Sequence, residues 1–430
     1  MTRVSKRESL LVFPALTGGC KVIILTLNCR SQTIHYHLFD YPNPIPLTSG
    51  YVEGIGTHTT NDVLDGAPLL LENHHDAINY ILETLCHPDY GVLESLEQLR
   101  GVGHRVVHGG ENYHHSVKID VEVLHNIRKV ERMAPKYNIP SRQAIIAAME
   151  LLPDIDHVAI FDTAFHHTMP PKAYMYPLPY EWYEKHRVRR YGFHGSSHLY
   201  LAHRAAAHLG KPLDQCNLIT IHLDLGISLC AIRQGHSVDT STGMTPVEGT
   251  AQERRCGNID PGIPGFIMDW EELSPQQIEE VLNEKSGLLG LTGGDCTTRQ
   301  EVLIKAADNE PRARLAADLE AYRLRKFIGE YLCVLGQCDA IVFSSGQGTI
   351  EADVRQRVLH GLECFNIFLD EEKNIQERCI HSEIKISQPQ SAVALYVIPS
   401  DEARVFCEDT AKIVLNKFTP ARPDYTFDDL

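Results

Sequence analysis

The same arrangement of apolar runs and glycine turns occurs twice in this chain. In the first half, "KVIILTLN" (21–28) is an apolar run typical of a buried strand, and "TIHYHLFDY" (33–41) alternates like its hairpin partner. In the second half, "NLITIHLDLGISLCAIRQG" (217–235) again gives a strand, a glycine turn and a strand. Two halves that each open in this way indicate duplicated α/β domains with a cleft between them.

The remaining periodic segments fill out both halves. Helical spacing predicts helices at 75–85, 93–99 and 351–365, and a helix capped by its first serine at 141–152. Apolar runs ending in glycine or polar residues predict strands at 101–110, 157–165 and 340–348. Residues 392–415 read as a strand, a turn and a closing helix.

Composition excludes several classes of protein. The net charge of −16 argues against a nucleic-acid partner. The twelve cysteines show no C-x-x-C spacing, which favours reduced thiols in the cytosol. The apolar stretch near the N-terminus is interrupted by Pro14, Gly18, Gly19 and Lys21, so we expect neither a signal peptide nor a membrane span there.

One segment points to an anion site. "VRRYGFHGSSHLYLAHRAAAHLG" (188–210) places two arginines and a histidine around a glycine turn that opens a helix. A helix N-terminus offers free N–H groups, and arginine offers forked donors, so phosphate or carboxylate would fit. The alternative is purely structural, with Gly192 and Gly195 making the turn and Ser196 or Ser197 capping the helix.

Three further features bear on chemistry, and each has a structural alternative. Asp162 ends an apolar strand, where α/β proteins form ligand crevices, although it could also cap a turn. Arg105 lies within a strand, so it needs an acidic or anionic partner, and we favour an anion over a salt bridge. The long Gly/Pro-rich loop Thr245–Gly265 is either functional or a solvated surface loop. The sequence has neither a Walker-type phosphate loop nor a convincing zinc pattern.

Several long segments, in order, resemble the acetate kinase family of the acetate and sugar kinase/Hsc70/actin superfamily. They are "GHRVVHGGENY", "VAIFDTAFHHTMPPKAYMYPLPYEWYEKHRVRRYGFHGSSH", "VDTSTGMTPVEG", "GNIDPGI", "KSGLLGLTG" and "VIPSDE". The resemblance implies an α/β fold of two duplicated ribonuclease-H-like domains with an interdomain active cleft. The N-terminal domain would comprise residues 1–163 plus 403–430, and the C-terminal domain residues 164–402.

The resemblance also implies an activity and its residues. The family transfers the γ-phosphoryl group of ATP reversibly to acetate, giving acetyl phosphate, with Mg²⁺; we expect a cytoplasmic homodimer that binds neither nucleic acid nor membrane. By position, the catalytic residues are Asp162, His194 and Arg255, the substrate-binding residues are Arg105 and Phe193, and the metal-binding residues are Asn28 and Glu402. The nucleotide-binding positions are His35, His222, Leu223, Asp224, Leu225, Gly226, Thr297, Arg299, Gly346, Gln347 and Gly348.

Both phosphate loops depart from the family pattern. Asn-Ala-Gly-Ser-Ser-Ser-Leu-Lys is "NCRSQTIH" here, so Arg30 replaces a glycine and His35 the lysine. His-Leu-Gly-Asn-Gly is "HLDLG", which introduces Asp224 and Leu225. A carboxylate ~4 Å from a phosphate costs about 1 kcal/mol in water and about 4 kcal/mol near a protein surface. Besides an ATP-dependent acetate kinase, the sequence therefore leaves open a pyrophosphate-dependent variant, another short-chain acyl substrate, and a weak or inactive paralogue that binds or regulates.

Overall fold

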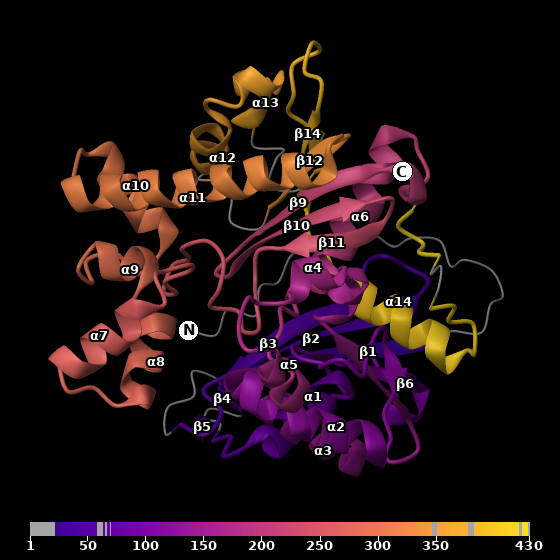
Figure 1. Ribbon diagram of the computed structural model, residues 1–430. Coiled ribbons are helices and arrows are strands. Elements are labelled where there is room, and N and C mark those ends of the chain that lie inside the picture. The colour runs from indigo at the N-terminus through magenta and orange to yellow at the C-terminus, as the bar shows by residue number, and fades with distance from the viewer. Residues whose placement is uncertain are drawn as a thin grey trace. The chain divides into compact units, whose positions relative to one another are not determined.

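The computed structural model describes residues 22–57, 63–64, 67–68, 70–345, 351–376, 382–420 and 424–428 (Figure 1). The chain divides into two compact units. Unit 1 comprises Met1–Ala164 and Glu402–Phe427, and unit 2 comprises Phe165–Asp401 and Asp428–Leu430.

Unit 1 is built on a six-stranded mixed sheet of order β3-β2-β1-β6-β8-β7. Its first strand is antiparallel to β2 and parallel to β6, and β6 is parallel to β8. The strands are β1 (Val22–Cys29), β2 (Thr33–Tyr41), β3 (Thr48–Glu53), β6 (Leu99–Val106), β7 (Val117–Lys118) and β8 (Asp156–Phe161), with a separate ribbon of β4 (Val63–Leu64) and β5 (Ala67–Pro68).

Unit 2 repeats this sheet strand for strand. Its order is β11-β10-β9-β12-β14-β13, with β9 antiparallel to β10, parallel to β12, and β12 parallel to β14. The strands are β9 (Asn217–Leu223), β10 (Ile227–Arg233), β11 (His236–Thr240), β12 (Ala340–Ser345), β13 (Ile384–Lys385) and β14 (Ala394–Pro399). The duplicated α/β architecture predicted from the sequence is thus confirmed.

Strand alternation decides which helices cover each face of the first sheet. Leu25 and Leu27 face the apolar core that α1 and α3 complete, whereas Ile24 packs against Cys407 and Ala411 of α14. The helices of unit 1 are α1 (His74–Leu85), α2 (Val121–Val130), α3 (Pro135–Leu151) and α14 (Glu402–Val414). Short 3₁₀ turns occupy Leu96–Gln98 and Glu131–Met133.

In unit 2 the long helix α11 (Pro311–Leu335) packs Leu324 and Ile328 on the sheet core. The group α7 to α10 gathers beyond one end of α11 (Figure 1). The other helices are α4 (Pro171–Tyr174), α5 (Tyr180–His186), α6 (Gly195–Leu209), α7 (Gly262–Trp270), α8 (Pro275–Glu284), α9 (Gly287–Leu291), α10 (Arg299–Ala307), α12 (Glu351–Leu359) and α13 (Glu371–Asn374), with 3₁₀ turns at Ala164–Thr168, Leu213–Gln215 and Glu363–Phe365.

The covering helices α6 and α14, called here the exchanged helices, each follow in the chain a strand of the sheet that they do not cover. Helix α6 follows β8 in the chain, yet it packs on β9, β12 and β14 of unit 2. Helix α14 follows β14, yet it packs on β1, β2, β6 and β8 of unit 1. Each sheet is therefore closed by a helix that the chain makes after the last long strand of the other half.

Two local predictions were wrong, and one structural alternative does not hold. Residues 93–99 form a 3₁₀ turn that runs into β6 instead of a helix. The helix predicted at 141–152 begins at Pro135 and contains Pro140. A proline has no N–H for the carbonyl four residues earlier, and here the Ser31 hydroxyl donates to that carbonyl, Lys136 O, at 3.2 Å. The structure thus replaces the lost helical bond with one that ties α3 to the β1–β2 turn.

The alternative that does not hold is the serine cap at the start of α6. The N-cap residue is His194, in a left-handed conformation with φ 59° and ψ 30°, and it makes no side-chain cap bond. Ser196 and Ser197 lie buried in the first turn instead.

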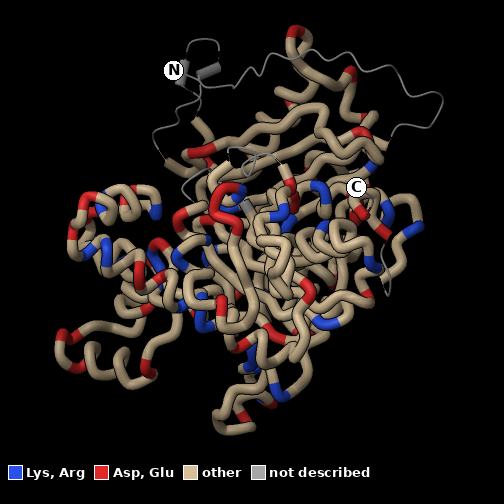
Figure 2. The backbone as a smooth tube through the Cα atoms, turned by 90° about the horizontal axis from the view of Figure 1, so that it is seen from above, with Lys and Arg blue, Asp and Glu red and all other residues tan. Residues whose placement is uncertain are grey.

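Charges of both signs interleave along the chain of each unit, as the coloured tube in Figure 2 shows. Among the described residues, none of the helices combines the length and apolar character needed to cross a membrane.

Candidate active site

The centre of unit 1 is a buried ion pair between Arg105 on β6 and Asp162 at the end of β8. Arg105 Nε donates to Asp162 Oδ1 at 3.0 Å, and Arg105 Nη2 donates to Oδ2 at 2.7 Å. Asp162 is completely buried. Arg105 Nη1 points to Asn28 Oδ1 at the end of β1, at 3.4 Å. The ion pair, the structural alternative for Arg105, is thus present, and it fixes the guanidinium in one orientation.

The electrostatics of this pair keep it charged. Burial works against the charged guanidinium, but Asp162 and then Glu402 more than compensate and raise the pKa of Arg105 above its usual range. Both carboxylate oxygens of Asp162 accept hydrogen bonds from Arg105. The geometry therefore favours a role in orienting Arg105 over that of a free base. Glu402, the first residue of α14, keeps its Oε1 buried, and no described residue forms a hydrogen bond with that atom.

The β1–β2 turn carries the altered first phosphate loop. Asn28 pairs with His35 across the hairpin, and the His35 ring stacks on Tyr51 with centroids 5.6 Å apart. Burial, with smaller contributions from the charges of Arg30 and Arg105, lowers the pKa of His35. His35 therefore does not supply at neutral pH the positive charge of the lysine that it replaces, whereas Arg30 does carry a charge in the same turn.

In unit 2, the turn at His194 is held from both sides. The Phe193 N–H donates to Thr242 Oγ1 at 3.0 Å, and the Phe193 carbonyl lies 3.0 Å from His166 Nε2. Burial lowers the pKa of His166 to about 4, so this ring is neutral at pH 7 and its Nε2–H donates to the carbonyl. These bonds stabilise the left-handed backbone of His194, which a non-glycine residue adopts only under such constraint.

His194, Arg255 and Gly226 come together at the β9–β10 turn. A Cβ built on Gly226 would lie 3.3 Å from His194 Nε2 and 3.5 Å from Arg255 Nη1. The two side chains therefore approach the same point of the turn, and the glycine leaves room for them. Two donors directed at one place suit a phosphoryl group, whose charge is spread over several oxygens.

Arg255 belongs to the irregular segment between β11 and α7, and Gln252 positions it. Gln252 Oε1 accepts from Arg255 Nη1 at 3.0 Å and from the Ile227 N–H at 3.4 Å, and its amide nitrogen donates to Pro246 O. The loop predicted at Thr245–Gly265 is thus irregular up to Pro261, where α7 follows. Its buried glutamine links the arginine to the phosphate turn.

The other residues of this turn differ in their surroundings. His222 lies on β9 with its ring centroid 4.1 Å from that of His194, and the Leu223 N–H donates to Ser344 Oγ. Leu225 is 49% exposed at the tip of the turn. The Asp224 carbonyl accepts from Arg299 Nη2 at 3.2 Å.

Arg299 and Thr297 have structural partners of their own. Arg299 is buried, and its Nε donates to both oxygens of Glu320 at 3.1 Å. The Thr297 hydroxyl and N–H donate to the carboxylate of Glu301, which also accepts from the Thr298 N–H in the capping box of α10. The predicted positions Gly346, Gln347 and Gly348 lie outside the described residues. Phe193 is 1% exposed, and its role in substrate binding stays a prediction.

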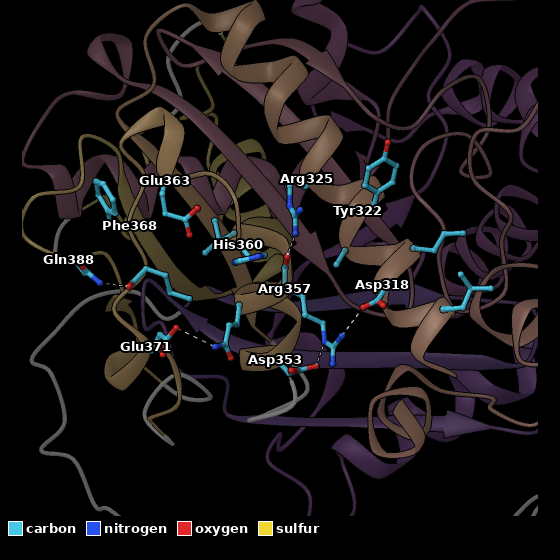
Figure 3. A pocket seen from close by; sticks show the side chains of 16 residues that line it. Asp318, Tyr322, Arg325, Asp353, Arg357, His360, Glu363, Phe368, Glu371 and Gln388 are labelled. Atoms are coloured by element: carbon cyan, nitrogen blue, oxygen red, sulfur yellow. Dashed lines mark hydrogen bonds and ion pairs between the residues drawn. The ribbon is translucent and has the colours of Figure 1, made fainter. Parts of the chain in front are cut away.

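A cavity of about 1020 Å³ lies elsewhere in unit 2, between α11, α12 and α13 (Figure 3). None of the predicted site residues lines it. Its arginines are already engaged, because Arg357 pairs with Asp353 and Asp318, and Arg325 donates to the carbonyls of Val358 and Arg357. A phosphate in this cavity would meet only arginines that already have bonded partners, and we do not place the reaction there.

Sequence reasoning missed the residues that hold the site in place. Gln252, Thr242, His166 and Ser228 are buried polar side chains bonded to site residues. Gln252 carried a signal, since it lies three residues before Arg255 in a loop already suspected of function, and His166 and Thr242 lie in segments that carry the family resemblance.

The two sheets share one strand order, and each has an arginine side chain at the hairpin turn after its first strand. This is the fold of the actin-like kinases. A model of the acetokinase family matches residues 23–408. The chain therefore belongs to the acetokinase family, whose kinases transfer phosphate to a carboxylate.

Individual relatives agree with this family. The acetate kinase of Trichlorobacter lovleyi is 45% identical over 419 residues, which cover 94% of this chain and 99% of that protein. The acetate kinase of Geobacter sulfurreducens is 46% identical and covers 94% of this chain and 98% of its own length. Among solved structures, Porphyromonas gingivalis acetate kinase superposes with a TM-score of 0.85 at 37% identity, covering 91% of this chain and all of that one.

Proposed function

We propose that this protein is an acetate kinase that transfers the γ-phosphoryl group of ATP reversibly to acetate. The observation that carries the proposal is the convergence of His194 Nε2 and Arg255 Nη1 on the Gly226 turn, in a chain 45% identical to named acetate kinases over most of its length. The same similarity supports activity over the inactive-paralogue alternative.

The chemistry follows from the charges of the reactants. A carboxylate oxygen of acetate attacks the γ-phosphorus, a new P–O bond forms, and the bond to the β-phosphate oxygen of ADP breaks. Acetate is already ionised, so no base is needed. Arg105, oriented by Asp162, binds the carboxylate through Nη1, while His194 and Arg255 donate to the phosphoryl oxygens as negative charge spreads over them.

The residues of unit 1 fit the magnesium that this reaction needs. Mg²⁺ takes one or two protein oxygens plus phosphates and water, and Glu402 Oε1 is a buried carboxylate oxygen with which no described residue forms a hydrogen bond. We propose that Glu402 and Asn28 hold the ion or its waters. Bound there, the ion would offset the negative charge of the phosphate oxygens. A cluster of three or more acidic, histidine or cysteine ligands is absent from the described residues.

A further part of the proposal concerns the residues that bind the nucleotide. We propose His35, the segment His222–Gly226, and Thr297, Arg299, Gly346, Gln347 and Gly348 as its surroundings. The charge of Arg30 supports phosphate binding at the first turn, where His35 does not supply one.

The test is a hydroxamate assay for acetyl phosphate with acetate, Mg²⁺ and a panel of ATP, GTP and pyrophosphate. We expect product with ATP, and at least about a hundredfold loss of kcat in Arg255→Ala. The neighbouring Arg254→Ala is the matched control, since Arg254 is exposed, and should retain activity. No product with any donor would refute the proposal.

We also propose a homodimer. Ile263, Phe266 and Trp270 form an exposed apolar stripe on α7, with Phe266 63% and Trp270 77% exposed, and such a stripe is typical of a protein interface. Light scattering should give twice the chain mass for the wild type and the chain mass for Trp270→Glu. A wild type that stays a monomer at micromolar concentration would exclude the dimer.

The cytoplasmic location and the domain limits stay proposals too. The described cysteines are all free thiols, which supports a reducing compartment, and the charge of −16 supports the absence of a nucleic-acid partner. The compact units support domains of 1–163 with 403–430 and of 164–402.

A further inference from the structure

A row of buried polar side chains lies behind His194. Ser228 Oγ on β10 is 2.8 Å from His194 Nδ1 and also 2.8 Å from His198 Nε2. His198 Nδ1 is in turn 2.8 Å from Thr220 Oγ1 on β9. Ser228, His198 and Thr220 are completely buried. Because buried polar atoms need partners, the hydrogen-bond directions along this row must be mutually consistent.

Two arrangements of protons keep the Ser228 hydroxyl proton within the row while His198 is neutral. Burial, together with the nearby His166 and His222, holds the pKa of His198 well below its ordinary value. A neutral histidine has one N–H and one lone pair, and a hydroxyl has one proton. In the first arrangement Thr220 donates to His198, His198 donates to Ser228, and Ser228 donates to His194 Nδ1. In the second, each of these bonds runs the other way.

The two arrangements differ in what His194 presents at Nε2. If Nδ1 accepts from Ser228, the neutral ring carries its proton on Nε2. If Nδ1 donates, the neutral ring has a lone pair at Nε2, which repels a phosphoryl oxygen. Nε2 is the atom that approaches Gly226 beside Arg255, so the direction of the row decides whether His194 helps or opposes the transfer.

The groups around the ring favour a neutral donor. His222 faces it from β9 at 4.1 Å between centroids, His198 lies behind it on α6, and the Arg255 guanidinium approaches the same turn. Arg255 already places a positive charge there, so a neutral His194 with Nε2–H avoids like-charge repulsion.

We propose that Ser228 is a positioning residue, whose hydroxyl, oriented by His198 and Thr220, donates to His194 Nδ1 and keeps Nε2–H directed at the transferring phosphoryl group. The proposal rests on the proposed phosphoryl transfer and names a residue that the reaction needs without touching the substrate. It parallels the orientation of catalytic histidines by a hydrogen-bonded partner on the remote nitrogen.

The first test is Ser228→Ala. We expect kcat to fall about 10- to 100-fold with smaller changes in both KM values, because one donor to the transition state is lost. Residual activity should rise toward acidic pH, because a protonated ring carries a proton on Nε2 whatever its neutral tautomer. Ser197→Ala is the matched control: it removes an equally buried hydroxyl, 2.8 Å from His222 Nδ1, and leaves the row intact. Its pH profile should keep the wild-type shape.

A Ser228→Ala enzyme with kcat within about threefold of wild type and an unchanged pH profile would overturn the proposal. If that variant does not fold, nitrogen NMR on ¹⁵N-histidine wild type decides, with the His194 signals assigned by their loss in His194→Gln. A lone-pair signal at Nδ1 and an N–H signal at Nε2 support the proposal, and the reverse overturns it. The NMR measurement needs no catalytic turnover, so it tests the proposal even if the assay for acetyl phosphate fails.

Discussion

Each unit buries an arginine that grips a carboxylate and also reaches the hairpin turn after the first strand of its sheet. In unit 1, Arg105 holds Asp162 and points Nη1 at the side chain of Asn28, 3.4 Å away. In unit 2, Arg299 holds Glu320 and donates from Nη2 to the backbone carbonyl of Asp224 at 3.2 Å. The two pairs share this pattern of contacts but not their place in the fold, because Arg105 and Asp162 lie on and at the end of sheet strands, whereas Arg299 and Glu320 lie on helices α10 and α11.

The difference between the two arginines lies in the second hydrogen-bond partner, which Arg105 can give up more easily than Arg299. The bond from Arg105 Nη1 to Asn28 is long and weak. A substrate carboxylate can replace Asn28 as the acceptor at little cost, since a charged acceptor makes the stronger bond. The Asp224 carbonyl is part of the main chain, and losing its partner would leave a polar group unpaired beside the phosphate turn. Arg105 is therefore suited to bind a ligand, and Arg299 to shape the turn.

The largest expected effect separates these roles by breaking each pair. Asp162→Asn and Glu320→Gln should each lower the free energy of unfolding by about 3–5 kcal/mol, because each leaves a buried arginine without its counter-charge. Only Asp162→Asn should also cost about a hundredfold in kcat/KM for acetate, since a misdirected Arg105 no longer holds the acceptor in line. Urea unfolding and initial rates measure the two quantities. An equal rise in acetate KM in Glu320→Gln would show that the two pairs are not distinct.

The sequence signals for the two arginines differed, since Arg105 stood out within a predicted strand and Arg299 only through the family resemblance. Periodic patterns predicted the main strands and the helices α1, α3, α6, α12 and α14 wholly or in part, because burial enforces those periods, but they did not predict the long α11. The role of Arg299 depends on Glu320, 21 residues away on another helix, and no local pattern reports that contact.

The same limit explains the wrong local predictions. A serine before an apolar run suggested a helix start at 141 and, as an alternative, a serine cap at 196 or 197, but tertiary bonds decided both. Ser31 takes up the carbonyl that Pro140 leaves unpaired, so α3 extends through the proline. Bonds to Phe193 from Thr242 and His166 hold the His194 backbone in the left-handed region. No local pattern in the sequence reports such contacts between distant residues.

The next effect concerns the close approach at the second turn. Gly226→Ala would place a Cβ 3.2 Å from the His194 ring, so the ring or the turn must shift by a few tenths of an ångström. We expect kcat to fall about tenfold with the fold intact. Gly329→Ala is the matched control, because a Cβ at Gly329 meets nothing within 4 Å. Wild-type kcat in Gly226→Ala would mean that His194 and Arg255 do not converge there during turnover.

A smaller effect tests the altered chemistry of that turn. Asp224→Gly with Leu225→Asn removes a negative charge and an exposed apolar side chain, while the backbone carbonyl that Arg299 binds is retained. ATP affinity measured by calorimetry should rise about tenfold, which corresponds to relief of about 1–2 kcal/mol of repulsion. Unchanged affinity would place these two residues away from the nucleotide phosphates.

The smallest effect extends the comparison to the exchanged helices. Helix α6 faces its sheet with the neutral Ser197 and His198, whereas α14 buries Asp409, whose oxygens accept from Ser116 Oγ at 2.5 Å and Tyr425 at 2.9 Å. Burial raises the pKa of Asp409 to about 6, with Glu408 nearby adding to the rise and Lys412 opposing it. A folded-state pKa above the unfolded value means that the protonated form stabilises the fold, so this contribution is complete below about pH 4 and is lost as the pH rises through 6.

Asp409→Asn abolishes this titration. Its free energy of unfolding, relative to wild type, should therefore rise by about 2 kcal/mol between pH 4 and pH 7. Urea unfolding at a series of pH values measures the difference. If the difference in free energy of unfolding between Asp409→Asn and wild type did not change with pH, the Asp409 carboxylate would be well solvated as the anion. Burial on α14 would then cost no more electrostatic energy than burial on α6.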